Sequence, residues 1–403
     1  MRGLTNDEAA AVERVGGEPM LAQVEAWAAV NSGSHNLAGL NEVAALLADA
    51  FAALPAEPVL REAAPVDSVL PSGERIALRH GRNLHLAVRR QAPVQLLFTG
   101  HMDTVFAPDH PFQDVFWRDD GVLGGPGVAD MKGGLAVLLA ALKAVEASPL
   151  AASLGYEVVI NSDEEVGSPG SAALIAEAAR GKKAALTYEP SALPDGTLAG
   201  ARPGSGNFSL IVTGRSAHAG RNPEDGRNAL LAAAELALRL AEAKAEGLSV
   251  NPARIDGGGP NNVVPDHAVL RINMRPRTLT DQARAQAALE AAVADVAMKR
   301  DVRIDMHGGW GRPPKPLDPA AEKLFGLVAR CGADLGQTIG WRDSGGVCDG
   351  NNIAACGVPV VDTMGVRGGA IHSDAEYLIV ESLAERARLS ALTILRLAQG
   401  EGL

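Results

Sequence analysis

Aromatic residues are scarce in this 403-residue chain, which has 7 Phe, 4 Trp and 3 Tyr. Proteins that bind single-stranded nucleic acid stack the bases on aromatic side chains, so the scarcity argues against that role. Basic residues are also in the minority, because 37 Lys and Arg stand against 48 Asp and Glu, for a net charge of −11. An acidic surplus disfavours contacts to phosphate, and we expect no nucleic-acid partner.

Cysteine is rare as well, with only Cys331, Cys348 and Cys356, an odd number without zinc-finger spacing. We therefore expect no disulfide framework, as in a reducing compartment. The chain lacks an uninterrupted apolar run of membrane-spanning length, and its first residues include Asp and Glu where a signal peptide would be apolar. These absences predict a cytoplasmic protein with no membrane segment.

What remains has the ordinary composition of a soluble globular protein, with 21% charged residues. At about 150 residues per domain, the length suggests two or three domains. Short apolar runs suited to strands alternate with Ala/Leu-rich helical segments in the first half of the chain, which predicts an α/β domain with a largely parallel sheet. From about residue 204 to residue 313, the predicted order is strand, helix, strand, strand, helix, strand, which is a ferredoxin-like arrangement.

The domain boundaries follow from this change in order. We predict that residues 1–203 form the first part of a catalytic domain and that residues 204–313 form an inserted smaller domain. A proline-rich stretch then returns the chain to the catalytic domain, which residues 314–403 complete.

Acidic residues and histidines come directly after several of the apolar runs. The carboxyl ends of parallel strands border the crevice in which open α/β sheets bind ligands, so these side chains are candidates for a site. Two further candidates stand in glycine-rich loops. The whole set comprises His101, Asp103, Asp130, Glu164, Glu165, Glu189 and His372.

Each candidate also has an ordinary structural interpretation. Asp130 could cap the helix that follows it, and the three carboxylates at 163–165 could form an exposed acidic turn. The joint pattern favours chemistry, because two histidines and three carboxylates are the ligand types for two zinc-like ions. A shared carboxylate would make the site co-catalytic, and a Glu left without a metal would serve as general base.

Seven sequence strings follow one another between about residue 95 and residue 380: TGHMDTVF, GGPGVADMKGG, NSDEEVGSPGS, YEPS, GRSAHAG, NNVVP and GAIHSDAEYL. Together they resemble the dinuclear zinc aminoacylase/carboxypeptidase family, which includes acetylornithine deacetylase, succinyl-diaminopimelate desuccinylase and bacterial glutamate carboxypeptidase. NSDEEVGSPGS and YEPS look most similar to the glutamate carboxypeptidases.

The resemblance implies a zinc-peptidase-like catalytic domain, with a mixed, largely parallel sheet flanked by helices, and a ferredoxin-like βαββαβ lid that also forms a homodimer. It further implies two Zn²⁺ per subunit, with Co²⁺ or Mn²⁺ as alternatives. Asp130 would bridge the two ions. His101 and Glu189 would complete one metal site, and Glu165 and His372 the other.

The resemblance also assigns roles around the metals. Glu164 would be the general base and then the acid, Asp103 would orient His101, and the peptide bond from Asp130 to Met131 is expected to be cis.

In the lid, the resemblance implies that His218 would reach into the partner subunit's active site and stabilise the oxyanion. Asn262 and Arg275 would bind the substrate carboxylate, since a guanidinium donates two parallel hydrogen bonds, and Arg312 is a weaker candidate for the same role. Cys348 departs from the family, because Ser or Thr is common there.

These residues predict a metal-dependent hydrolase that cleaves an amide bond and releases an amino acid with a free carboxylate, in the manner of a glutamate carboxypeptidase. Within the same class, the alternative is an N-acyl-amino-acid deacylase of the acetylornithine deacetylase or aminoacylase type. A different class of protein, a non-catalytic metal- or peptide-binding protein on the same scaffold, is disfavoured because every expected ligand and Glu164 are present.

Overall fold

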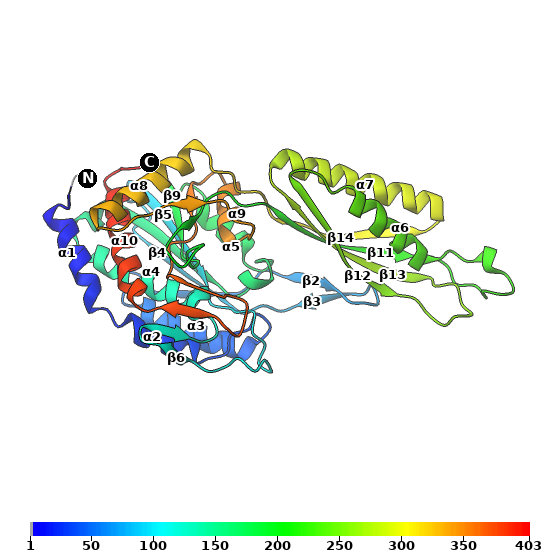
Figure 1. Cartoon of the computed structure of the whole chain (residues 1–403), viewed down its shortest axis with the longest axis horizontal. Helices are drawn as coiled ribbons and strands as arrows, with labels where there is room; N and C mark the ends of the chain where they lie inside the picture. Colours follow the sequence, from blue (N-terminus) through cyan, green and yellow to red (C-terminus); the bar gives the residue numbers. More distant parts are fainter. Residues whose placement is uncertain (1–2) are drawn as a thin grey trace.

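The computed structural model describes residues 3–403 as a large lobe and an elongated smaller lobe (Figure 1). A six-stranded sheet of order β1-β4-β8-β5-β9-β16 runs through the large lobe. The strands β8, β5, β9 and β16 are parallel, whereas β4 and β1 are antiparallel to their neighbours. This confirms the predicted mixed, largely parallel sheet. Its strands are β1 (Val59–Arg61), β4 (Asn83–Val88), β5 (Val94–His101), β8 (Leu154–Asn161), β9 (Ala184–Thr187) and β16 (Val360–Val361).

Helices cover both faces of this sheet, as expected for parallel strands whose side chains are apolar on both sides. One face belongs to the main hydrophobic core, in which α4 is buried along nearly its whole length. The helices of this core are α1 (Asn6–Arg14), α2 (Met20–Ala28), α3 (Leu37–Phe51), α4 (Gly133–Glu146), α8 (Pro319–Asp334) and α10 (Glu381–Ala398). The other face packs against α5 (Ala172–Ala179) and α9 (Asp349–Ala355).

Short strands that the sequence did not reveal shape the edge of the large lobe. A four-stranded sheet of order β17-β18-β7-β6 joins a glycine-rich loop to a loop near the C-terminus. Its strands are β6 (Phe116–Asp119), β7 (Val122–Gly124), β17 (Gly368–Gly369) and β18 (Tyr377–Ile379), and a separate parallel pair consists of β10 (Leu198–Ala199) and β15 (Trp341–Arg342). Two regions far apart in the chain therefore lie side by side.

The smaller lobe confirms the predicted βαββαβ order, and its antiparallel sheet has the strand order β12-β13-β11-β14. Its elements are β11 (Ser205–Thr213), α6 (Ala229–Glu242), β12 (Leu248–Gly257), β13 (His267–Pro276), α7 (Leu279–Arg300) and β14 (Arg303–Arg312). Both helices pack on the sheet around a hydrophobic core of their own. We call residues 205–312 the lid. The domain boundaries stay a prediction.

A hairpin of the large lobe also contacts the lid. Strands β2 (Val66–Val69) and β3 (Arg75–Leu78) project along the lid sheet (Figure 1). Arg271 Nη2 of the lid donates a hydrogen bond to the Val69 carbonyl at 2.7 Å, and His267 Nε2 lies 3.0 Å from the Pro71 carbonyl. The lid is thus connected to the large lobe by the two chain crossovers and also by contacts with this hairpin.

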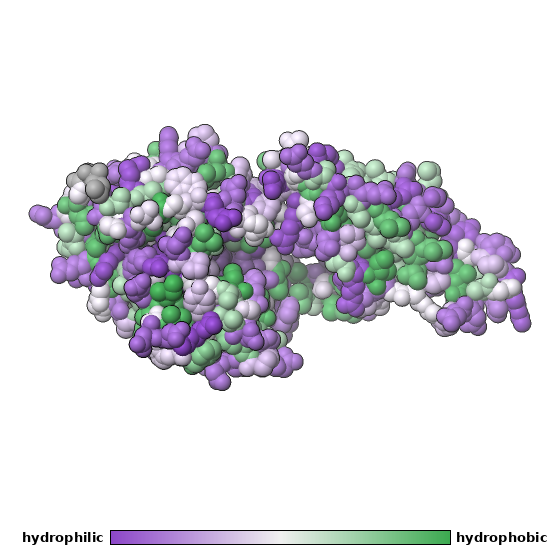
Figure 2. Space-filling model, in the orientation of Figure 1, coloured by the Kyte–Doolittle hydropathy of each residue, from purple (hydrophilic) through white to green (hydrophobic). Residues whose placement is uncertain are grey.

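Figure 2 shows a notch on the molecular surface between the two lobes. Within residues 3–403, the helices all fall short of the length and apolar character that crossing a membrane demands. The predicted compartment stays a prediction.

Candidate metal centre and active site

Three neighbouring parallel strands end at the same edge of the large sheet and bring the predicted ligands together. His101 is the last residue of β5, Glu164 and Glu165 form a helical turn just after β8, and Glu189 follows β9. Since β5 pairs with both β8 and β9, their carboxyl ends lie next to one another. This is the position at which open α/β sheets bind ligands.

Asp130 lies between His101 and His372, which are far apart in the sequence. Its Oδ1 is 3.0 Å from His101 Nε2, and its Oδ2 is 3.3 Å from His372 Nε2. One carboxylate therefore presents one oxygen to each histidine. The peptide bond from Asp130 to Met131 is cis, as expected.

The remaining carboxylates divide between the two histidines. Glu189 Oε2 is 3.7 Å from His101 Nε2, and Glu165 Oε2 is 3.1 Å from His372 Nε2. Donor atoms of His101, Asp130 and Glu165 lie within 4.8 Å of one another, and so do those of His101, Glu164 and Glu189. The structure thus brings together all five predicted metal ligands and the predicted base.

The electrostatics of this cluster reveal an excess of negative charge. Burial raises the pKa of Glu164 to about 7, and burial together with the charge of Asp130 raises the pKa of Glu165 to about 8. Burial lowers the pKa of His101, but the carboxylates around it, Glu189 foremost, outweigh burial and raise it overall. Hydrogen bonds to Asp130 and Glu165 raise the pKa of His372 to about 11.

Divalent cations fit this donor set. Imidazole and carboxylate groups are ligands of zinc-like ions, and cations between these carboxylates would relieve their mutual repulsion. Glu189 Oε1 is buried and has no hydrogen-bond partner among the described residues, which leaves a lone pair for a metal. Asp130, with an oxygen toward each histidine, suits a bridging position.

Asp103 contacts His101, as the resemblance implied, and it also holds the turn that follows β8. His101 Nδ1 lies 2.9 Å from the backbone carbonyl of Asp103, but 3.4 Å from its carboxylate. That carboxylate instead accepts the backbone N–H groups of Glu164 and Glu165, both at 3.1 Å, and the Ser34 hydroxyl at 2.7 Å. Asp103 therefore holds both His101 and the turn that carries the two glutamates.

Glu376 is a functional residue that the sequence analysis missed. Its buried carboxylate accepts the backbone N–H groups of Gly127 at 3.2 Å and of Ala129 and Asp130 at 3.0 Å. It thereby fixes the loop that presents Asp130. The only hint in this stretch is that Glu376 stands four residues after the predicted ligand His372 in the string GAIHSDAEYL, with a loop and not a helix between them.

Comparison with known proteins agrees with this geometry, since residues 97–396 match the peptidase family M20/M25/M40. The chain belongs to this family. It is 31% identical over 326 residues to carboxypeptidase G2 of Pseudomonas sp. (strain RS-16), covering 80% of this chain and 78% of that protein. It is 27% identical over 344 residues to the succinyl-diaminopimelate desuccinylase of Nitrosospira multiformis (strain ATCC 25196 / NCIMB 11849 / C 71), with 80% and 88% coverage.

Among solved structures, the aminopeptidase PepT of Bacillus cereus ATCC 10987 is similar with a TM-score of 0.70 and 25% identity, covering 96% of this chain and 99% of that one. The chain is therefore an M20 metallopeptidase or amidohydrolase that acts on peptides or amino-acid derivatives. A dinuclear metal site is typical of the family, and the clustered His, Asp and Glu side chains are the candidate donors for it.

Within residues 3–403 of this M20 enzyme, three of the predicted lid residues make no hydrogen bond or ion pair with the predicted metal ligands. His218, Asn262 and Arg275 are all exposed. His218 Nδ1 accepts the backbone N–H of Gly220 at 3.1 Å, a contact within its own loop. Arg312 is the exception, because it is buried and its Nη2 lies 2.8 Å from Glu164 Oε1.

Cys348 lies near the site but is not built as a nucleophile. Its thiol caps α9 by accepting the backbone N–H of Gly350 at 3.4 Å, and its Sγ lies 3.4 Å from Asp362 Oδ2. Burial raises the pKa of this thiol well above its usual value, which keeps it protonated. Cys348 is therefore a structural group in this protein.

Proposed function

We propose that this M20 enzyme is a carboxypeptidase of the glutamate-carboxypeptidase type, which uses two zinc ions to release an amino acid with a free carboxylate. The observation that carries the proposal is the position of Asp130 between His101 and His372, with Glu164 beside His101. The similarity to carboxypeptidase G2 supports the choice of peptide-bond chemistry.

The metal ligands in this proposal are divided between two positions. His101 and Glu189 would hold one zinc ion, Glu165 and His372 the other, and Asp130 both. When bound, the two ions supply Lewis acidity that polarises the scissile carbonyl and eases the ionisation of water.

Glu164 is the proposed proton carrier. It would accept a proton from the attacking water and then donate that proton to the leaving nitrogen, as a general base that becomes a general acid. Its backbone N–H is held by Asp103, so the turn is set before substrate arrives. Asp103 itself would act as a positioning residue, through His101 and through this turn.

His218 is proposed to act in the active site of a partner subunit. β11 starts at the crossover from the large lobe and has 9 residues, which carries its far end about 30 Å away. The loop after β11 lies at the end of the lid that is remote from the large lobe (Figure 1). A homodimer would bring such a loop to the other subunit's metal centre, where His218 would stabilise the oxyanion.

The lid surface supports a dimer. Apolar side chains gather over α6 (Figure 2), and this helix exposes Leu231 and Leu238, at 52% and 69% of their surface. Exposed apolar surface on one element marks a contact surface for a protein partner.

Asn262 and Arg275 are proposed to bind the substrate carboxylate. Arg275 is exposed; its Nε donates to Asn273 Oδ1 at 3.0 Å and its Nη1 to the Gly345 carbonyl at 3.4 Å. A substrate carboxylate would replace the longer contact to form a bidentate pair. The resemblance also suggested Arg312, whose guanidinium is occupied by Glu164 in this structure.

The test is amino-acid release from a panel of substrates, with the enzyme loaded with Zn²⁺, Co²⁺ or Mn²⁺. Acyl-glutamates and folyl-glutamates, other dipeptides and N-acetyl amino acids should be compared. We expect glutamate release from the acyl- and folyl-glutamates to be fastest and to stop when a chelator removes the metal. Faster release from N-acetyl or N-succinyl amino acids would identify a deacylase instead, and metal binding without turnover would identify a binding protein.

A further inference from the structure

Arg312 is the last residue of the lid strand β14, yet its side chain is buried in the large lobe at 5% exposure. Its Nη2 lies 2.8 Å from the carboxylate oxygen Oε1 of Glu164 and 2.9 Å from the Glu164 backbone carbonyl. One guanidinium therefore contacts both the side chain and the backbone of the residue proposed as general base.

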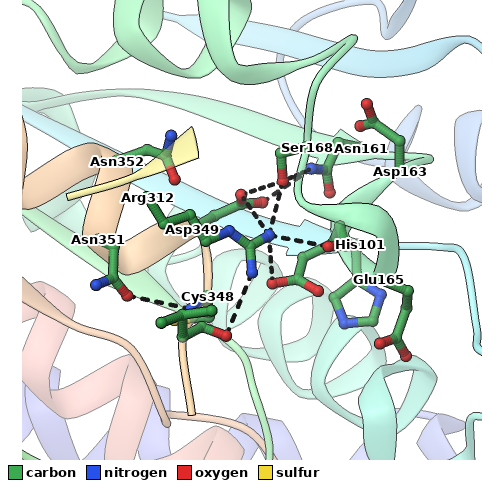
Figure 3. Close-up of polar contacts among 12 residues, drawn as sticks. His101, Asn161, Asp163, Glu165, Ser168, Arg312, Cys348, Asp349, Asn351 and Asn352 are labelled. Atoms are coloured by element: carbon green, nitrogen blue, oxygen red, sulfur yellow. Dashed lines mark hydrogen bonds and ion pairs between the residues drawn. The ribbon is translucent and has the colours of Figure 1, made fainter. Parts of the chain in front are cut away.

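The other contacts of Arg312 hold it in place (Figure 3). Nη2 also donates to Ser168 Oγ at 2.9 Å and lies 3.5 Å from Asp349 Oδ1, and Nη1 donates to the Val347 carbonyl at 3.3 Å. Asp349 is anchored in turn, because its Oδ2 accepts from Asn161 Nδ2 at 2.8 Å. Asn161 is the last residue of β8, so the network is fixed to the central sheet.

We propose that Arg312 is a positioning residue, which orients the Glu164 carboxylate and ties it to the lid, and that Asp349 holds Arg312 for this purpose. The inference rests on the proposed function, because it assumes that Glu164 moves the proton. A guanidinium is suited to the task, since the separate nitrogens of its planar fork take different partners: Nη2 reaches the Glu164 carboxylate while Nη1 donates to the Val347 carbonyl. Within residues 3–403, Arg312 is the only lid residue that forms an ion pair with Glu164.

The experiment separates positioning from substrate binding by measuring kcat and KM for the best panel substrate. Arg312→Met and Asp349→Asn should each lower kcat about 10–100-fold, as expected for loss of a group that orients a catalytic residue, with little change in KM and a normal metal content. Arg312→Lys should fall between Arg312→Met and the wild type, because it keeps the charge but loses the fork. If Arg312→Met does not fold, Arg312→Lys and Asp349→Asn still decide.

Matched controls come from the same strand. Arg303 begins β14, and its side chain is 74% exposed and paired with Asp305 on the surface. Arg303→Met and Asp305→Asn should leave both constants unchanged. A raised KM with unchanged kcat in Arg312→Met would show that Arg312 contacts the substrate instead, and it would overturn the proposal. Unchanged constants would overturn it as well.

A second measurement does not depend on turnover. Spin labels on the exposed Cys356 and on a cysteine at position 298, made by Met298→Cys on α7, report the distance from the large lobe to the lid, while Cys331 and Cys348 are buried. Arg312→Met should broaden this distance distribution, and an unchanged distribution would reject the link to the lid. If the wild type cleaves no panel substrate, the proposed function fails, but the label distances still test the link.

Discussion

The metal centre and the lid present their functional residues in opposite ways. His101, Asp130 and Glu189 are buried, contact one another and are contributed by one lobe of one chain. His218 and Arg275 of the lid are exposed and lie outside that cluster. The proposed metal-binding half of the site is thus assembled in the folded subunit, whereas the proposed substrate-binding half would have to be brought to it by lid position or by a partner.

The largest expected effect concerns Glu164 in the metal-binding half. Glu164→Gln removes the proton carrier but keeps the shape, so kcat should fall by about 10²–10⁴-fold. The protein should still bind two metal equivalents, as measured by elemental analysis, because the five proposed ligands remain. Glu177→Gln, at an exposed position on α5, is the control and should have normal activity. Near-normal turnover of Glu164→Gln would show that another group carries the proton.

The lid gives the next largest effect. His218→Ala should lower kcat by about 10²–10³-fold, as expected for loss of one oxyanion contact, without loss of metal. If His218 acts across a dimer, mixing His218→Ala with Glu164→Gln should restore activity. Random pairing of the two variants makes about half of the dimers mixed. In each mixed dimer, one of the two active sites has both Glu164 and His218. About a quarter of all sites are then complete, so about a quarter of wild-type activity should return.

That result would decide whether the two halves of the site belong to different subunits. Subunits should be exchanged by partial unfolding and refolding of the mixture, and each variant treated alone serves as control. If the mixture is no more active than each variant alone, His218 either acts in the active site of its own subunit or has no role in catalysis.

The same contrast explains what the sequence could predict. His101 and Glu189 were predictable because apolar runs mark β5 and β9, and the ends of parallel strands meet at one edge. The ferredoxin-like order of the lid followed from its alternating strand and helix patterns. Glu376 was not predictable in this way, because its partners are backbone N–H groups of a loop 246 residues earlier in the chain. For Arg312, likewise, the sequence shows a positive charge but not the carboxylate that it faces.

Substitution of Glu376 should have a smaller effect, on metal affinity, and it tests whether the metal centre is assembled in advance. Glu376→Ala removes the acceptor for three N–H groups of the Asp130 loop, and metal affinity should fall about 10–100-fold, as for other outer-shell partners. Titration of the metal-free protein with Zn²⁺ checks this. Glu376→Gln keeps one carbonyl acceptor and should lie between Ala and wild type, and Glu381→Gln, at the exposed start of α10, should bind metal normally. Equal affinities in all three variants would mean that the loop holds its shape without Glu376.

The smallest effect on the metal centre should come from the lid core, which has its own hydrophobic cluster. Leu289 on α7 is fully buried, and Leu289→Ala should destabilise the protein by about 2–5 kcal/mol. Met298 on the same helix is 78% exposed, and Met298→Ala should stay within about 0.5 kcal/mol of the wild type. Under conditions where Leu289→Ala is still folded, Zn²⁺ affinity should match that of the wild type, because the five proposed ligands all lie in the other lobe. A parallel loss of Zn²⁺ affinity would show instead that the lid core and the metal centre are coupled, which would remove the distinction between a preassembled half and a half that is brought to it.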